Sequence, residues 1–581
     1  MAEIVLPFSR ENKVDGHGEG FQNCAFFQSL PGPLREAAEQ HHHLFDYLHW
    51  LPIEEVGVPQ YLEMLSRKMD EVKEPNIIYP VGKGIFAHIL ADPADTRHHY
   101  IAIEPALTMD LGRTLSEVET RCIELGDQLP EFDAEGDRER QLLDYVERVT
   151  TPGGGGLEVS GRRSWFPFLR RGGVKLSRLR LSEQEMEGVK YLFIRDKLKL
   201  GALEPLVSDP YIEDISCSGV GQLFIEHKVF KGLKSTIAFS SLDDLDDFVV
   251  RLAEQVRKPV SYKSPISDAM LPSGARINIV YGRDVSKRGS NFSIRKFSQV
   301  PTSIFELVDL GTIDYRMLAY LSLAIDNGMN LFVAGESASG KTTMLNALTA
   351  FIHPMAKIVS IEDTPELQVP HENWIREVVQ TDSQDPKDGA VTTFDLLKAA
   401  LRQRPNEILV GEIRGPEGNV AFQAMQTGHS VMATFHASSI EKLIQRITAA
   451  PILVPKSYMD NLNVAILMSS VRLPDGKVGR RITNIDEIAG YDPPSQSFDI
   501  VESFKWDEAT DTFDFTGNMN SFVLEHKIAT RLGIPTNQKH RIYADVERRA
   551  RIFARLHRER GITGFYDVLK VLSQAQRQGL L

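Results

Sequence analysis

The sequence predicts an α/β protein whose last part contains a mainly parallel sheet with helices on both faces. Three observations lead to this fold class. Short apolar runs alternate with helix-length patterns from about residue 303 onward, a glycine-rich turn joins one apolar run to a helix, and acidic residues directly follow two other runs. The expected strands are residues 331–334, 358–361, 408–410 and 431–434.

The first region, residues 1–173, is an extension of mixed character. Helical patterns cover residues 34–51 and 61–72, and a strand pair is expected at 85–90 and 99–103, joined by a turn-rich Asp-Pro-Ala-Asp segment. A helical part and a small sheet are therefore expected before the glycine-rich linker 151–156.

Residues 162–171 follow that linker and place arginines on both sides of Trp165, Phe166 and Phe168. Two interpretations of this arginine segment stay open. Basic residues around aromatic rings can dock on an anionic membrane or on a protein partner. The segment can equally be a linker attached to a neighbouring domain.

The second region, residues 174–300, predicts a mixed α/β domain. Ser182 and Glu185 form a capping box at the start of a helix that runs through Lys199. Strand character follows at residues 211–216, 223–226, 275–280 and 291–294. The third region, residues 301–581, holds the mainly parallel sheet and a C-terminal helical tail.

The amino-acid composition excludes several classes of protein. Among 581 residues, 79 acidic side chains outnumber 66 basic ones and give a net charge of −13, which disfavours a surface made for nucleic acid. Cys24, Cys122 and Cys217 are too few and too far apart for a disulfide framework or a cysteine zinc site. No apolar run reaches the length of a membrane span, and the N-terminus lacks signal-peptide regions. We therefore expect a soluble protein of the reducing cytoplasm, with at most peripheral membrane contact.

The glycine-rich turn matches the complete phosphate-binding pattern G-x-x-x-x-G-K-[ST]. Its glycines let backbone N–H groups point at phosphate oxygens, its lysine supplies a charge for the β- and γ-phosphates, and its threonine hydroxyl can bind magnesium. The turn stands between an apolar strand and a helix N-terminus, as this chemistry requires. The predicted nucleotide-binding residues are Gly335, Glu336, Ser337, Ala338, Ser339, Gly340, Lys341, Thr342 and Thr343.

Candidate catalytic carboxylates follow two of the strands. Glu412 comes after the apolar run 408–410 and Gly411, in the place where a nucleotide hydrolase orients water and completes the magnesium environment. Glu362 begins an acidic cluster, residues 362–366, which should open onto the same crevice. Single carboxylates at strand ends can be mere helix caps, but two beside a phosphate loop favour catalysis. Thr342 and Glu412 are the candidate magnesium ligands.

Two histidines flank the expected strand 431–434. His436 stands at the end of that strand, where it can sense the γ-phosphate or couple it to a neighbouring group. His429 precedes the strand, and a structural role fits it as well as a sensing role does. His436 is therefore the candidate carried forward.

Arginines of the second region supply further candidates, namely Arg276, Arg283 and Arg295. Phosphoryl transfer spreads negative charge over equatorial oxygens, and a rigid guanidinium fork suits that charge. Because these arginines lie outside the nucleotide domain, they can complete the site of their own chain or that of an adjacent subunit. The alternative is that they are solvated arginines on exposed strands.

Together these segments resemble the type II/type IV secretion superfamily of hexameric ATPases. The resemblance rests on the loop 335–342, the acidic box 361–366, residues 401–415 and residues 425–437. Within that superfamily the chain is most similar to the motor ATPase of the archaeal archaellum, through residues 370–374, 451–463, 520–525 and 564–581. The resemblance is nearly complete after about residue 174 and weaker before it.

The resemblance implies a RecA-like nucleotide domain in which Lys341 and Thr342 bind ATP and Mg²⁺. It also implies that Glu412 and Glu362 polarise or position the attacking water, that His436 reports the nucleotide state, and that the three arginines approach the site. It implies a cytoplasmic homohexamer, peripheral at the inner face of the cell membrane, which works under a polytopic membrane platform protein with other archaellum motor components. Such a motor would assemble or rotate a filament.

Other classes stay open at this point. A nucleic-acid motor would use a similar nucleotide domain but needs a basic channel, and stimulation of ATPase activity by DNA would favour it. A nucleotide-binding scaffold without turnover would bind tightly and release no phosphate. An ATPase of an archaeal pilus or of a type II secretion-like system is the nearest alternative, because loops and termini decide partners more than the nucleotide site does.

Overall fold

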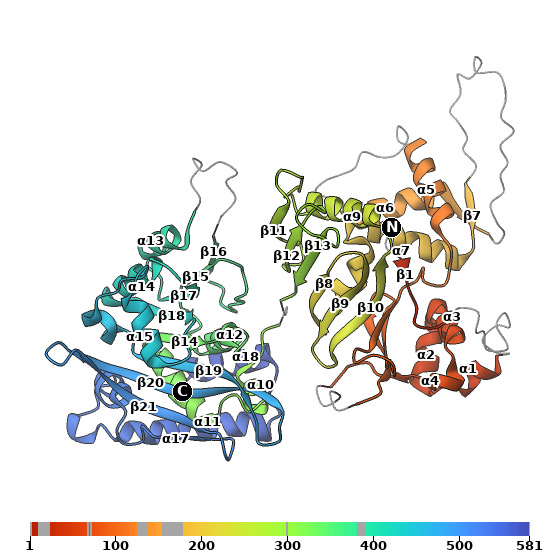
Figure 1. Cartoon of the computed structure of the whole chain (residues 1–581). Helices are drawn as coiled ribbons and strands as arrows, with labels where there is room; N and C mark the ends of the chain where they lie inside the picture. Colours follow the sequence, from red (N-terminus) through yellow and green to blue (C-terminus); the bar gives the residue numbers. More distant parts are fainter. Residues whose placement is uncertain are drawn as a thin grey trace, which may run out of the picture. The chain divides into compact units, whose positions relative to one another are not determined.

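The computed structural model describes residues 3–9, 24–66, 69, 72–124, 137–153, 178–297, 300–379 and 391–579. The chain divides into two compact units, Met1–Phe297 and Ser298–Leu581, each with its own large sheet (Figure 1). The arginine segment 162–171 and most of the glycine-rich linker lie outside the described residues. Among the residues described, no helix is long and apolar enough to cross a membrane.

The first unit is built on one continuous sheet. In its described part the strand order is β11-β12-β13-β8-β9-β10-β5-β4-β3-β2, and β1 pairs with β10. Adjacent strands are antiparallel except for the pairs β10–β5 and β2–β3, which are parallel. The strands are β1 (Glu3–Ile4), β2 (Gln60–Tyr61), β3 (Asn76–Gly82), β4 (Ile85–Leu90), β5 (His99–Ile103), β8 (Ile212–Cys217), β9 (Gly221–His227), β10 (Lys231–Phe239), β11 (Ile266–Met270), β12 (Arg276–Val280) and β13 (Asn291–Arg295).

Residues from the predicted first and second regions share this sheet. Lys234 of β10 pairs with His99 of β5, and the hydroxyls of Tyr79 and Tyr100 donate to Oδ2 of the buried Asp209 at 2.6 and 2.8 Å. Removing residues 1–173 would expose an edge of β10 and leave that carboxylate without these donors. The division into three regions stays a prediction, and a chain that begins near residue 174 would lose part of the first unit's core.

Helices of the first unit form three groups. Helices α1 to α4 pack against β4 and β5, helices α5 to α7 pack with one another beside the short strands β6 and β7, and α8 and α9 cover the main sheet. The bounds are α1 (Ala25–Ser29), α2 (Gly32–Gln40), α3 (His42–Trp50), α4 (Ile53–Val56), α5 (Gly112–Glu124), α6 (Arg138–Val149), β6 (Thr150–Pro152), β7 (Leu179–Leu181), α7 (Glu183–Leu198), a 3₁₀ turn (Gly201–Leu203), α8 (Glu204–Ser208) and α9 (Leu242–Gln255).

Local predictions in this unit have mixed outcomes. The strand pair 85–90 and 99–103 is confirmed as β4 and β5, and the capping box of Ser182 and Glu185 is present at the start of α7. The helix predicted at 61–72 is wrong for its described residues: Tyr61 belongs to β2, and Leu65 is buried in the core of the sheet. Apolar residues at this spacing face the sheet instead of forming one side of a helix.

The second unit contains the predicted sheet with its neighbouring strands. Its strand order within the described residues is β16-β15-β17-β18-β14-β19-β20-β21-β22. Strands β16 to β19 in this order are parallel, whereas β20 to β22 add an antiparallel edge. The strands are β14 (Leu331–Gly335), β15 (Ile358–Glu362), β16 (Trp374–Val378), β17 (Glu407–Ile413), β18 (Ser430–Phe435), β19 (Val464–Arg472), β20 (Val478–Asp492), β21 (Ser497–Asp507) and β22 (Thr512–Asp514).

Helices cover both faces of this sheet (Figure 1). In β14, Leu331 and Val333 belong to one hydrophobic core, and Phe332 and Ala334 belong to the core on the other face. The helices are α10 (Ile304–Asp309), α11 (Tyr315–Asp326), α12 (Lys341–Leu348), α13 (Thr393–Gln403), α14 (Glu417–Gln426), α15 (Ile440–Thr448), α16 (Ala529–Arg531), α17 (Arg541–Ala554) and α18 (Phe565–Arg577), with 3₁₀ or π turns at Thr349–Phe351, Lys456–Asn461, Val523–Ile528, Thr536–Gln538 and Arg555–Glu559.

The predicted α/β fold class is therefore confirmed. The four expected strands correspond to β14, β15, β17 and β18, and they stand next to one another in the parallel part of the sheet. The C-terminal helices are an integral part of the core, because Phe553 of α17 and Leu572 of α18 are buried against α10, α11 and the turn after α12.

Candidate nucleotide site

Strand β14 carries the phosphate loop, and α12 begins directly after it. Gly340, just before the helix, has a φ of 94°, in the left-handed region that favours glycine. Gly335 lies against β19: a Cβ at this position would be 2.4 Å from the carbonyl oxygen of Met468 and 2.5 Å from Oγ of Ser339. Geometry therefore requires glycine at both positions.

Lys341 opens α12 with only 8% of its surface exposed. Its Nζ donates to the carbonyl oxygen of Glu336 across the loop at 2.7 Å, and Oγ of Ser339 donates to the same oxygen at 2.9 Å. Burial lowers the pKa of Lys341, the Glu412 carboxylate opposes this effect, and Arg414 adds to it. A partly desolvated cation inside a glycine cradle, at a helix N-terminus, fits the phosphates of a nucleotide.

A pocket of about 500 Å³ opens beside the loop. Because β18 pairs with β14, the segment that follows β18 reaches the same end of the sheet as the loop does. Thr342 and Thr343 are half-buried in the first turn of α12. The pocket is lined by Gly335, Glu336 and Ser337 of the loop, by His436, Ala437 and Ser438 after β18, and by Lys442, Gln445 and Arg446 of α15.

Sequence reasoning missed the two basic residues of α15. Arg446 donates from its guanidinium to the carbonyl oxygen of His436 and lies 5.3 Å from the ring centroid of Phe435. Lys442 lines the pocket one turn earlier on the same helix. The available signal was two cations four residues apart just after His436, since that spacing places both on one helix face.

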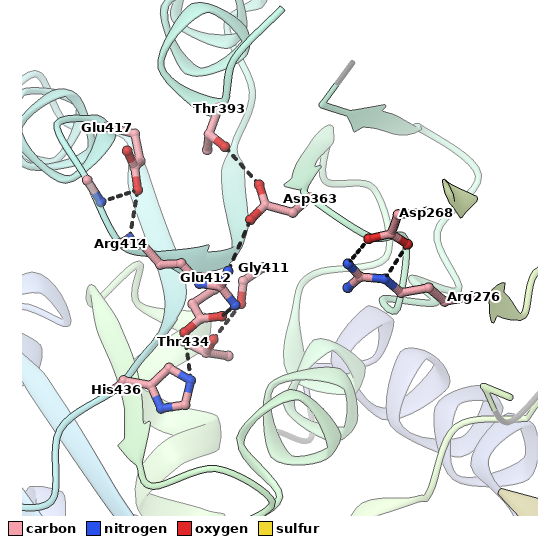
Figure 2. Close-up of polar contacts among 11 residues, drawn as sticks. Asp268, Arg276, Asp363, Thr393, Gly411, Glu412, Arg414, Glu417, Thr434 and His436 are labelled. Carbon is pink, nitrogen blue, oxygen red and sulfur yellow. Dashed lines mark hydrogen bonds and ion pairs between the residues drawn. The ribbon is translucent and has the colours of Figure 1, made fainter. Parts of the chain in front are cut away.

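Glu412 and His436 come from neighbouring strand ends. Strand β17 pairs with β18, and Figure 2 shows the contacts that follow. Oε1 of Glu412 lies 2.8 Å from Nε2 of His436, an ion-pair distance without the alignment of a hydrogen bond, and Oε2 is paired with Arg414. Burial lowers the pKa of His436, Glu412 raises it, and the cations Lys341 and Arg414 lower it further. The imidazole is thus uncharged near neutral pH.

Arg414 joins the ends of two strands. One guanidinium nitrogen lies 3.9 Å from Oδ2 of Asp363, and the other carboxylate oxygen of Asp363, Oδ1, accepts from Oγ1 of Thr393 at 3.1 Å (Figure 2). Oε1 of the buried Glu417 accepts from the backbone N–H groups of Arg414 and Gly415, both at 2.7 Å. The turn after β17 is therefore held in place, and Arg414 is held beside Glu412.

Glu362 occupies a different environment from Glu412. It is 2% exposed, and its Oε1 accepts from the N–H groups of Glu366 and Leu367 at 2.8 and 2.7 Å. Oε2 lies 3.4 Å from Nε of Arg376, and burial raises the pKa of Glu362 to about 7. A Cβ at Gly411 would lie 3.2 Å from Cγ of Glu362, so a side chain there would press on this carboxylate.

Glu362 should leave a signature in the pH dependence of stability. Its pKa in the folded chain is above that of an unfolded carboxyl, so the folded state holds the proton longer, and stability falls as pH rises from about 4.5 to about 7. We expect Glu362→Gln to remove this contribution. At pH 8 the free energy of unfolding of the variant should exceed that of wild type by about 1 to 3 kcal/mol, and its unfolding midpoint should be correspondingly higher.

Calorimetry between pH 5 and pH 8 measures this effect as the difference between the unfolding midpoints of Glu362→Gln and wild type at each pH. The matched control is Glu372→Gln, an exposed carboxyl of the segment between β15 and β16, for which the difference should stay flat with pH. A Glu362→Gln protein whose midpoint follows wild type at every pH would contradict the assignment.

The predicted arginines lie in the other unit. Arg276 of β12 makes a two-pronged pair with Asp268, with N···O distances of 3.0 and 2.5 Å (Figure 2). Arg283 lies 3.1 Å from Asp243, and Arg295 of β13 lies 3.1 Å from a carboxylate oxygen of Asp214. All three are exposed, and a role in phosphate chemistry stays a prediction for each of them.

Comparisons with known proteins decide the family. A family model described as "Type II/IV secretion system protein" matches residues 196–468. The type IV secretion system protein PtlH of Bordetella pertussis is 32% identical over 271 residues, which cover 43% of this chain and 79% of PtlH. The chain belongs to the type II/IV secretion system protein family.

Another relative is similar to this chain over nearly its full length. The uncharacterised protein MJ0900 of Methanocaldococcus jannaschii is 40% identical over 551 residues, which cover 94% of this chain and 97% of that protein. Among solved structures, the VirB11 ATPase of the Brucella suis type IV secretion system is similar at 24% identity over 51% of this chain and 94% of VirB11, with a TM-score of 0.26. The family model and PtlH confirm the resemblance to the type II/type IV secretion superfamily, and every candidate site residue lies inside the family match.

Proposed function

We propose that the protein is a Mg²⁺-dependent ATPase that works as a homohexameric motor. One arrangement carries the proposal: the buried Lys341 and its glycine loop open onto a pocket that His436 also lines, with Glu412 beside that histidine. The match to the type II/IV secretion system protein family and to PtlH supports a role of this ATPase in a secretion-type system. Release of phosphate from ATP by the purified chain tests it, and tight binding without release would favour a scaffold instead.

Each residue has a distinct task in this proposal. The backbone N–H groups of the loop and Lys341 hold the phosphates. Mg²⁺, bound by Thr342 and the Glu412 carboxylate, would neutralise charge on the phosphate oxygens. Glu412 orients the attacking water and accepts its proton, because it is the less buried carboxylate, with a side chain 17% exposed. Glu362 positions the loop that follows β15 through its backbone contacts.

His436 connects the site to α15. Its imidazole is uncharged and lies beside Glu412, while its carbonyl oxygen accepts from Arg446. A change of charge near Glu412 on hydrolysis alters the contact between Glu412 and His436 and thereby the position of the segment that leads into α15. We propose this path as the sensor of nucleotide state.

The cellular role proposed is assembly or rotation of an archaellum, at the cytoplasmic face of the membrane and under a polytopic membrane platform protein. The motifs at 370–374, 451–455, 460–463 and in the tail support this choice. A pilus or type II secretion-like ATPase is the alternative. A deletion strain that lacks archaella but keeps its pili would support the first role, and the reverse phenotype the second.

Assembly should affect catalysis if arginines act across subunits. We expect activity per subunit to rise with protein concentration, and we expect Lys341→Ala subunits mixed with Arg276→Ala subunits to recover activity that neither has alone. Phosphate release by the mixture, compared with the sum of the separate proteins, measures this.

The matched control for the mixing experiment is Arg148→Ala. Arg148 is an exposed arginine of the same unit that pairs with Asp144 at 2.8 Å, so its loss should leave activity unchanged. A role across the interface would be contradicted by an Arg276→Ala protein that is fully active alone. It would also be contradicted by a monomer whose specific activity does not change with protein concentration.

A further inference from the structure

A cluster of metal-binding donors lies in the first unit, among residues that the proposed nucleotide chemistry does not use. His41, His43 and Glu187 bring two imidazoles and one carboxylate together, with donor atoms all within 4.8 Å of one another. These residues come from the corner between α2 and α3 and from α7. Two histidines with one carboxylate form a donor set typical of zinc and related divalent transition metals.

The histidine side of the cluster is held in place by its backbone. His41 both ends α2 and begins α3: its N–H donates to the carbonyl oxygen of Ala37 at 3.1 Å, and its own carbonyl oxygen accepts from Leu44 at 3.0 Å. Nε2 of His43 donates to the carbonyl oxygen of Gly84 at 2.7 Å. That contact fixes the proton on Nε2 and leaves the lone pair of Nδ1 available, an orientation characteristic of metal-binding imidazoles.

Glu187 reaches the histidines because α7 packs unusually closely on the segment after β5. The next residue is Gly188, where a Cβ would lie 2.5 Å from Cδ1 of Leu111 and 3.0 Å from Cε of Met109. A larger residue at this position would require the ends of the Leu111 and Met109 side chains to move. The fold therefore brings this carboxylate to the two imidazoles.

The space beside the cluster is small. A cavity of about 10 Å³ adjoins two of the three donors, His43 and Glu187, and His42 and Asp46 of α3 also line it, whereas His41 does not. This volume corresponds to about one water molecule or ion and leaves no room for an organic substrate.

We propose that His41, His43 and Glu187 bind one zinc-type divalent metal ion, with water completing its coordination. The ion serves as a structural clamp between two hydrophobic clusters, one formed by α1 to α4 and the other by α5 to α7. The clamp holds the N-terminal helices on the rest of the first unit and takes no part in the phosphate chemistry.

The test uses the full-length protein and Zn²⁺ in competition with a chromophoric chelator. We expect one tight site per chain, and a loss of affinity of at least about 10-fold in His41→Ala and in Glu187→Gln, since each removes a ligand. The control is His98→Ala, because His98 belongs to the same unit but lies outside both the cluster and the cavity beside it, and this variant should keep wild-type affinity. Thermal unfolding of each protein with and without Zn²⁺ gives a second readout, because binding to the folded state raises the midpoint.

Two results would overturn the proposal. The first is unchanged zinc affinity in both His41→Ala and Glu187→Gln. The second is loss of binding in His42→Ala together with full binding in Glu187→Gln, which would mean that the histidine run chelates the metal without the fold. Glu187 is exposed, so Glu187→Gln should fold even if a histidine variant does not. Neither readout depends on ATP hydrolysis, and failure here leaves the proposed ATPase untouched.

Discussion

Lys341→Ala should reduce ATP hydrolysis below detection while the chain stays folded. The side chain is the cation of the phosphate loop, it is almost fully buried, and its Nζ reaches the carbonyl oxygen of Glu336 across the loop. Alanine removes the charge that would contact both the transferred and the leaving phosphate, in a site where water replaces it poorly. Phosphate release at saturating ATP and Mg²⁺ is the measurement, and the unfolding midpoint confirms that the fold persists.

The control for this variant is Lys398→Ala. Lys398 of α13 lies in the same unit with its Nζ 3.9 Å from the ring centroid of Phe394, and its loss should leave phosphate release close to wild type. Near-normal ATP turnover by Lys341→Ala would contradict the assignment of the nucleotide site, because the loop would then be a glycine turn with no chemical role.

Glu412→Gln should leave ATP bound but uncleaved. Glutamine keeps the shape of the side chain but loses the charge that pairs with Arg414 and attracts His436. It also loses the ability to accept a proton from water, an effect that usually costs about 10²- to 10⁴-fold in rate. Single-turnover phosphate release measures the loss, and retention of labelled ATP on the protein shows that binding survives.

Glu362→Gln is the sharpest comparison for this variant. Its carboxylate is occupied by the backbone of Glu366 and Leu367 and is 2% exposed, so the glutamine variant should keep much more activity than Glu412→Gln does. If Glu412→Gln releases phosphate at the wild-type rate, Glu362 or Glu366 must hold the main role instead.

The phosphate loop was predictable because its chemistry is local. The order strand, glycine turn and helix fixes where Lys341 and Thr342 stand, and no distant residue is needed to see it. The alternation of apolar runs with helical patterns predicted the parallel sheet for the same reason, because a short continuous apolar run by itself indicates a buried strand. The helix predicted at 61–72 failed because Tyr61 pairs with β3, a contact that local spacing does not encode.

The difference between the two carboxylates appeared only in the structure. In sequence, Glu362 and Glu412 both end apolar runs and look equivalent. The fold buries Glu362 beneath its own loop, which raises the pKa of Glu362, and it leaves Glu412 beside His436, so the partners of the two carboxylates differ. The roles of Arg414 and Arg446 were missed for the same reason, because each depends on a partner from another strand or helix.

By itself, the sequence determined the fold class of the second unit, the phosphate loop and the superfamily, all of which depend on residues close together in the chain. Only the tertiary structure decided that β1 to β5 share a sheet with β10, that Gly411 packs against Glu362, and that His41 and His43 meet Glu187. The physical reason is that hydrogen-bond partners, desolvation and metal-donor geometry depend on distances between segments far apart in sequence. Those distances are set by how sheets and helices pack, and they leave no periodic pattern in the chain.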